Sequence, residues 1–407
     1  MSTLLLALRN ILRNKRRTSI TFLAIISGIT GLIVFGGFIE FSFLGLRETT
    51  IRTQLGHIQI YKKGYLEKGV ANPSKYLIDN PSEVEDITAV IPEILMVTSR
   101  LTFSGLISNG EKTLSCQGIG INPAKEEEMS SFETIVEGEQ LWPDMTNKGV
   151  VGVELLRGLG AKVGDYLTIL TTTIDGMINA IEFQVVGVAQ TGSKDYDSVF
   201  VKLPVNLVQR LLNTTSAEKI VILLDDTKNI DHVVSEIENL IKENNFDLEI
   251  TTWDKLATFY YKVVALYNGL FDVIKVIIGV IVLFSIANTM TMSVFERVRE
   301  IGTLRAIGTT KSRIVSLFIT EGILIGILGG ILGILAGISV AYIINISGGI
   351  YISPPPGMTR GYLSMILIEP GVIWYAFIST VFVSGISSIY PAYKAARLKI
   401  VEALQHI

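Results

Sequence analysis

Side chains that commonly carry chemistry are scarce in this chain of 407 residues. It holds three histidines, His57, His232 and His406, and one cysteine, Cys116. No G-x-S-x-G, H-E-x-x-H or paired-cysteine motif occurs, and Gly308-Thr-Thr-Lys-Ser312 lacks the Gly-Lys pair of a phosphate-binding loop. We therefore expect no catalytic residue, no metal site and no cofactor bound by this chain. We interpret His57 as an exposed strand residue and Cys116 as a buried apolar one.

The most distinctive charged segment is FERVREIGTLRAIGTTKSR, residues 295–313. Its charged side chains alternate with Val298, Ile301, Leu304 and Ile307, which recur every three residues. This spacing predicts a short amphipathic helix. Such a helix either lies on a membrane or docks into a groove on a partner protein.

The charged segment 295–313 lies between the second and third of four long apolar runs. They cover about 20–46, 271–294, 314–346 and 372–389. Each can cross a hydrocarbon core of ~30 Å, which takes roughly 20 residues. The expected fold is therefore an α-helical membrane protein with four transmembrane helices and a large extracytoplasmic domain between the first two.

The distribution of charged residues predicts on which side of the membrane each segment of the chain lies. Residues 47–270 hold 31 acidic and 20 basic side chains, a net charge of −11, whereas Lys and Arg gather before the first run, between the second and third, and after the fourth. Lys and Arg near span ends mark cytoplasmic loops. Both termini are therefore expected in the cytoplasm, and the acidic insert argues against a nucleic-acid partner.

These observations set an order of segments along the chain. We expect transmembrane helices 1 to 4 over 18–46, 269–294, 314–346 and 372–390. The cytoplasmic segments are expected to be an amphipathic helix on membrane lipid over 1–17, a helix over 295–313 and a tail over 391–407. The outer segments are expected to be a domain with helical stalks over 47–268 and a loop over 347–371. The stalk at 254–268 is expected to join the second span without a break.

The insert reads as an α+β domain. Apolar alternation predicts strands at 57–61, 114–121, 166–172, 181–188, 199–201, 220–224 and 248–252, and helices at 81–90, 152–159, 205–212 and 230–243. Residues 124–144 are acidic and poorly periodic, so we expect a surface excursion with Glu126, Glu127 and Glu128 in solvent.

Inside the spans, two features demand close packing or pairing. Glu40 and Glu321 are costly in a membrane unless they are paired or near an interface. The third span carries two rows of small residues: Gly322, Gly326 and Gly330, and Gly329, Gly333 and Gly337. Such rows let helices approach closely, within the chain or at the seam with a second copy.

Several stretches together resemble a known family. They are LRNILRNKRRT from residue 8, VGVELLRGLGAKVGD from 151, FQVVGV from 183, ERVREIGTLRAIG from 296, and YPAYKAAR from 390 followed by EAL at 402–404. In this order they resemble the permease subunits of the MacB, LolC/LolE and FtsX superfamily of ABC transporters.

The resemblance implies partners and a coupling site. Two permeases, either two copies of this chain or the chain and a paralogue, would pair with a separate cytoplasmic ATPase dimer that binds ATP and Mg²⁺, in a bacterial inner membrane. The helix after span 2 would rest on that ATPase. Its polar contacts would be Glu296, Arg297, Arg299, Glu300 and Arg305, with Ile301 and Leu304 as anchors.

The substrate is a further inference from the resemblance. The absence of a fused nucleotide-binding domain and the size of the outer domain favour the LolC/LolE type, which extracts lipoproteins or lipids and passes them to a periplasmic carrier. An apolar vestibule would be lined by Phe38, Phe41, Phe43, Phe259, Tyr260, Leu266, Tyr267 and Phe271. Ordinary helix packing explains these residues equally well. The alternatives are a tripartite efflux permease for drugs, peptides or toxins, and an FtsX-like signalling device acting on an outer hydrolase.

Overall fold

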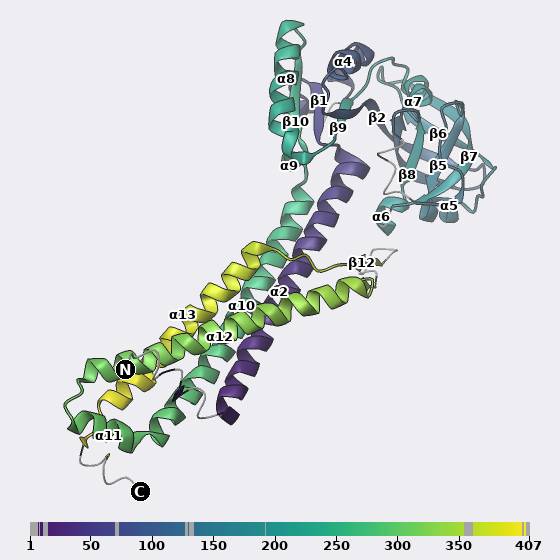
Figure 1. The fold of residues 1–407 in the computed structure, drawn as a ribbon. Helices are drawn as coiled ribbons and strands as arrows, with labels where there is room; N and C mark the ends of the chain where they lie inside the picture. Colours follow the sequence, from purple (N-terminus) through teal and green to yellow (C-terminus); the bar gives the residue numbers. More distant parts are fainter. Residues whose placement is uncertain are drawn as a thin grey trace. The chain divides into compact units, whose positions relative to one another are not determined.

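The computed structural model describes residues 7, 9–10, 15–69, 73–126, 129, 134–191, 193–353, 361–400 and 403. The chain divides into two compact units, a helical unit and an α+β unit (Figure 1). The helical unit comprises Met1–Leu44, Val263–Ile352 and Leu363–Ile407, and the α+β unit comprises Gly45–Lys262 and Ser353–Tyr362. The predicted helix over 1–17 lies almost wholly outside the described residues, as do Glu127, Glu128 and the tail motif at 402–404 except Ala403.

Four long helices account for the four predicted spans. They are α2 (Lys15–Thr50), α10 (Thr258–Glu296), α12 (Lys311–Ile346) and α13 (Pro370–Ala396). Each is long and apolar enough to cross a membrane. A short strand pair, β11 (Ile350–Ile352) and β12 (Tyr362–Ser364), lies between α12 and α13 in the sequence.

The predicted continuous stalk before α10 is interrupted. α9 (Trp253–Leu256) ends before Ala257, whose ψ of 50° is not helical, and α10 begins one residue later. Trp253 is buried in the core of the α+β unit, and its ring contacts that of Tyr260 at 5.4 Å between centroids. The prediction of an unbroken stalk over 254–268 is therefore wrong at Ala257.

Both glycine rows of α12 pack against helices of the same chain. A Cβ built on Gly333 would lie 2.8 Å from Cβ of Ile29, closer than real Cβ atoms approach other atoms. One row, Gly329, Gly333 and Gly337, faces Ile25, Ile29 and Ile33 of α2, while Gly322 and Gly326 face Ser388 and Ser384 of α13 and Gly330 faces Phe377. The close approach predicted for these rows is therefore used inside this chain.

The α+β unit is built on one mixed sheet. Its order is β10-β1-β9-β2-β3-β8-β5-β7-β4, with β6 paired to β2 and β7. The strands are β1 (Ile58–Lys62), β2 (Ile94–Ser108), β3 (Thr113–Ile121), β4 (Thr134–Gly138), β5 (Lys148–Gly152), β6 (Tyr166–Thr172), β7 (Ile178–Gln190), β8 (Phe200–Pro204), β9 (Lys219–Leu224) and β10 (Leu248–Thr252). The accompanying α-helices are α3 (Tyr65–Lys68), α4 (Pro81–Thr88), α5 (Val153–Leu159), α6 (Lys194–Asp197), α7 (Val205–Leu212), α8 (Ile230–Glu243) and α9. The predicted strands and helices are present, whereas β2, β4 and β5 are additional.

The long strand β2 links two apolar cores. Its first half pairs with β9 and its second half with β3 and β6. One core gathers β1, β9 and the inner face of α8, and the other gathers β3, β6, β7, β8, α5 and α7. In α8 the buried side chains are Ile230, Val233, Ile237 and Ile241, a helical spacing that leaves its opposite face in solvent.

Glu126 corrects the prediction of a solvated acidic excursion. Its side chain is 2% exposed, and its two carboxylate oxygens accept from Nε and Nη2 of Arg100 at 2.7 and 2.8 Å. Arg100 is itself buried on β2, and a buried guanidinium requires a carboxylate. Strand β4 also lies within the predicted excursion.

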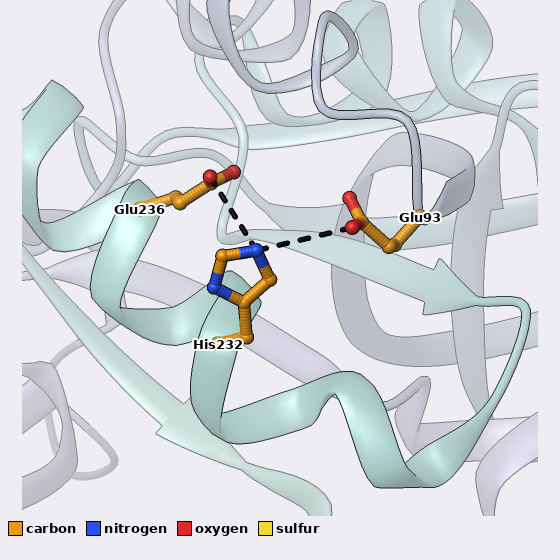
Figure 2. A group of neighbouring side chains, drawn as sticks. All are labelled: Glu93, His232 and Glu236. Atoms are coloured by element: carbon orange, nitrogen blue, oxygen red, sulfur yellow. Dashed lines mark ion pairs between the residues drawn. The ribbon is translucent and has the colours of Figure 1, made fainter.

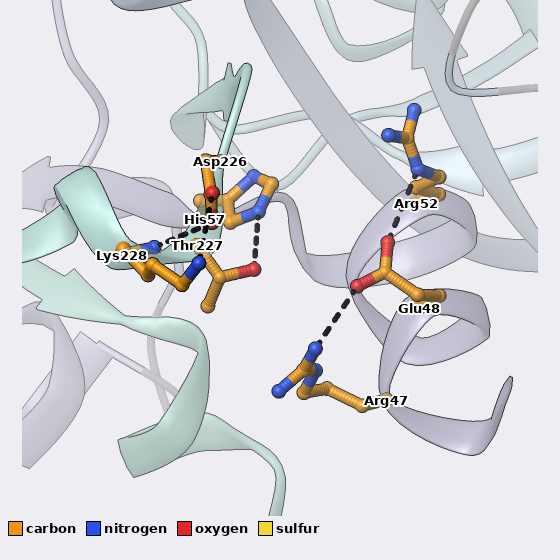
Figure 3. Close-up of polar contacts among 7 residues, drawn as sticks. All are labelled: Arg47, Glu48, Arg52, His57, Asp226, Thr227 and Lys228. Atoms are coloured by element: carbon orange, nitrogen blue, oxygen red, sulfur yellow. Dashed lines mark hydrogen bonds and ion pairs between the residues drawn. The ribbon is translucent and has the colours of Figure 1, made fainter. Parts of the chain in front are cut away.

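His57 is also placed differently from its prediction. It lies just before β1 and is 2% exposed. Its Nδ1 accepts from the backbone N–H of Leu224 at 3.1 Å, and its Nε2 lies 3.2 Å from Oγ1 of Thr227 (Figure 3). Burial lowers the pKa of His57 to about 4, because it disfavours the charged ring. The prediction of an exposed residue is therefore wrong, and His57 is a neutral core histidine.

Cys116 is buried, as predicted. Burial raises the pKa of its thiol to about 11, so the group stays protonated and unreactive at neutral pH.

Candidate coupling site

The segment between the second and third spans forms a separate short helix, α11 (Val298–Ala306). It is separated from α10 at Arg297, where the backbone turns to φ −116° and ψ 17°. It ends near Gly308, whose φ of +99° favours glycine, and α12 begins at Lys311. The predicted cytoplasmic helix over 295–313 is therefore shorter. Its first two residues belong to α10, its last three belong to α12, and residues 297 and 307–310 are not α-helical.

The inner face of α11 packs on the neighbouring helices. Val298 and Ile301 are buried. Ile301 shares an apolar cluster with Ile314 and Phe318 of α12 and with Ala392, Ala395 and Ala396 of α13. Ile301 is therefore an internal packing residue and not the predicted anchor for an ATPase. Leu304 is half-buried.

Buried Arg297 pairs with two glutamates, the buried Glu321 and the exposed Glu300. Its Nη1 lies 3.2 Å from Oε2 of Glu321 on α12, and its Nε lies 3.2 Å from Oε2 of Glu300. The guanidinium also lies over the ring of Phe318, 5.3 Å from its centroid. The expectation that Glu321 has a partner is met. Arg297, at 4% exposure, belongs to the interior and not to the predicted contact surface.

Arg305 supplies a third attachment. Its Nη1 donates to the carbonyl oxygen of Ala396 at the end of α13, at 2.7 Å. A cation at a helix C-terminus also complements the helix dipole. α11 is thus held to α12 and α13 by apolar packing, a buried ion pair and this hydrogen bond.

The outer face of α11 remains exposed. It carries Arg299, Glu300, Thr303 and Ala306, and it is flanked by the exposed Glu296 at the end of α10 and the exposed Ile307 just after α11. Ile307 is 79% exposed and was visible in the sequence only as the last residue of the apolar stripe. Of the predicted ATPase contacts, Glu296, Arg299 and Glu300 therefore lie where a partner can reach them.

The predicted vestibule residues divide between the two units. In the helical unit Phe38, Phe43 and Phe271 pack in its core, where the rings of Phe43 and Tyr267 meet edge to face at 6.3 Å. Phe41 is half-buried, and Leu266 and Tyr267 are exposed on α10. Phe259 and Tyr260 belong to the α+β unit, where Tyr260 packs in its core. The eight residues therefore do not act as one group in either unit.

Comparison with known proteins accounts for both units. Residues 18–240 match the family described as the MacB-like periplasmic core domain, and residues 273–400 match the FtsX-like permease C-terminal family. The macrolide export ATP-binding/permease protein MacB of Psychrobacter arcticus is 26% identical over 98% of this chain and 58% of its own length. The lipoprotein-releasing system transmembrane protein LolE of Haemophilus influenzae is 24% identical over 57% of this chain and 57% of its own. The chain therefore spans less than two thirds of either relative.

A solved structure is similar to part of the chain. The periplasmic region of MacB from Actinobacillus actinomycetemcomitans covers 50% of this chain and 92% of its own, with 15% sequence identity and a TM-score of 0.39.

Proposed function

Because this chain belongs to the MacB, LolC/LolE and FtsX superfamily of ABC transporter permeases, we propose that it couples ATP hydrolysis by a separate cytoplasmic ATPase dimer to movement of its outer domain. The observation that carries this proposal is the two-faced helix α11. Its inner face is fixed to α12 and α13 by packing and by Arg297, while its outer face offers charges and Ile307 to a partner. A force on the outer face would therefore move α11, α12 and α13 together.

The proposed setting is a bacterial inner membrane with both termini and α11 in the cytoplasm. The basic clusters beside the spans and the acidic insert support this orientation. ATP and Mg²⁺ would be bound by the ATPase, and a second copy of this chain or a paralogue would complete the permease pair.

The leading proposal for the substrate is a lipoprotein or lipid, extracted from the membrane and handed to a periplasmic carrier. The similarity to LolE supports it. The exposed Leu266 and Tyr267 on α10 also offer apolar surface beside Phe43, of the kind an acyl chain would need.

The second candidate is efflux of drugs, peptides or toxins through an adaptor and an outer-membrane channel. The match to MacB over 98% of this chain favours it. Both candidates use α11 in the same way and differ only in what the outer domain moves.

A charge placed on the outer face of α11 tests the coupling. Ile307→Asp is expected to weaken binding of the ATPase to the purified chain about thirtyfold, the loss typical of one interface hot spot, and so to lower its recovery. Val90→Asp in the outer domain is the matched control, because Val90 is also 79% exposed. Both variants should reach the membrane in normal amounts. Unchanged ATPase recovery with Ile307→Asp would exclude this face as the docking surface.

A further inference from the structure

Three potential metal ligands lie together on the α+β unit (Figure 2). His232 and Glu236 are one turn apart on α8, on the side opposite its buried residues. Glu93 lies in the turn before β2, and its carbonyl oxygen accepts from the N–H of Asp225 at 3.1 Å. Two separate elements of the unit therefore bring three side chains to one place.

Their spacing is close to that of a coordination shell. His232 Nε2 lies 3.6 Å from Oε1 of Glu236 and 3.9 Å from Oε1 of Glu93, and all three ligand atoms lie within 4.8 Å of one another. Around a tetrahedral ion with bonds of ~2.1 Å, ligand atoms would be about 3.4 Å apart. The side chains of His232 and Glu236 are 62% and 42% exposed, so both can turn to close this difference.

Glu93 provides a second, independent observation. Its other carboxylate oxygen, Oε2, is buried and has no hydrogen-bond partner among the described residues. A buried carboxylate oxygen without a donor is unfavourable, and a bound cation would compensate it. The oxygen that lies toward His232 is Oε1, so a cation held by both carboxylate oxygens of Glu93 would also compensate Oε2.

We propose that Glu93, His232 and Glu236 bind a divalent transition-metal ion of the Zn²⁺ class, with water completing its coordination. One neutral imidazole and two carboxylates suit such an ion better than Ca²⁺ or Mg²⁺, which prefer oxygen ligands alone. Two carboxylates also balance its charge. The metal would join α8 to the turn before β2, so it would stabilise the half of the unit whose core contains β1 and β9.

The proposal goes beyond ATPase coupling and is independent of it. Its sequence signal is the spacing of His232 and Glu236, which places both ligands on one helix face. Glu93 is far away in the sequence, so the third ligand becomes visible only in the folded chain.

The test is a titration of the full-length chain, in detergent and freed of metal, with ZnCl₂ by calorimetry. We expect one Zn²⁺ whose affinity falls about tenfold or more in His232→Ala and in Glu93→Gln. Glu238→Gln is the matched control, because Glu238 lies on α8 but faces Lys242. Zn²⁺ should also raise the unfolding temperature of the wild type but not of His232→Ala.

Two outcomes would overturn the proposal. One is Zn²⁺ binding of equal affinity in the wild type and His232→Ala. The other is no Zn²⁺ binding by the wild-type chain.

Discussion

Arg297→Met is expected to lower the free energy of unfolding of this chain by about 3–5 kcal/mol, the usual cost of removing one partner of a buried ion pair. The guanidinium lies 3.2 Å from Glu321, whose side chain is 4% exposed. Methionine fills similar space but leaves this carboxylate without its cation. The measurement is denaturant-induced unfolding of the purified full-length chain in detergent.

Two further variants make this prediction specific. Arg299→Met changes an exposed arginine of α11 and should alter the free energy of unfolding by less than about 0.5 kcal/mol. The double variant Arg297→Met, Glu321→Met should recover most of the loss, because it removes both charges. If the two single losses simply added, the ion pair would not be what holds α11 to α12.

Acidification is expected to destabilise the α+β unit through His57 by up to about 3 kcal/mol. The pKa of His57 is lowered to about 4 in the folded chain, against an ordinary value of 6.5. The unfolded chain takes up the proton at a higher pH than the folded chain does. The stability contributed by neutral His57 is therefore fully present above pH 6.5 and is lost as the pH falls towards 4. A protonated ring also cannot accept the N–H of Leu224.

The pH dependence is measured by unfolding the full-length chain at a series of pH values between these two limits. His57→Gln should have a flatter profile than the wild type, because glutamine does not titrate there. Equal slopes for the wild type and His57→Gln would show that His57 is not the titrating group.

The long elements could be predicted from the sequence because their patterns are local. The apolar runs of α2 and α12, and the helical spacing of α8, depend only on neighbouring residues. Strand β2 escaped prediction because buried Thr98, Ser99 and Arg100 interrupt its apolar pattern where it passes from one core to the other. Their polarity suggests a surface loop until the partner of Arg100 is known.

The coupling helix was also predictable, but its orientation was not. Ile301 and Ile307 belong to the same apolar stripe, and the sequence does not distinguish the residue that packs inward from the one that points outward. The buried partner of Arg297, Glu321, is 24 residues away on another helix. The ion pairs that decide which face is free therefore emerge only from tertiary packing.

The most direct test of the coupling account is to purify the chain gently from the membranes of its own host and identify by mass spectrometry what accompanies it. The account predicts an ABC ATPase in stoichiometric amount together with acylated lipoproteins. An ATPase with an adaptor and an outer channel would retain the coupling role of α11 and replace extraction by efflux. An ATPase with an outer hydrolase and no substrate would favour signalling. Recovery without any ATPase, under conditions that preserve such complexes, would contradict the account.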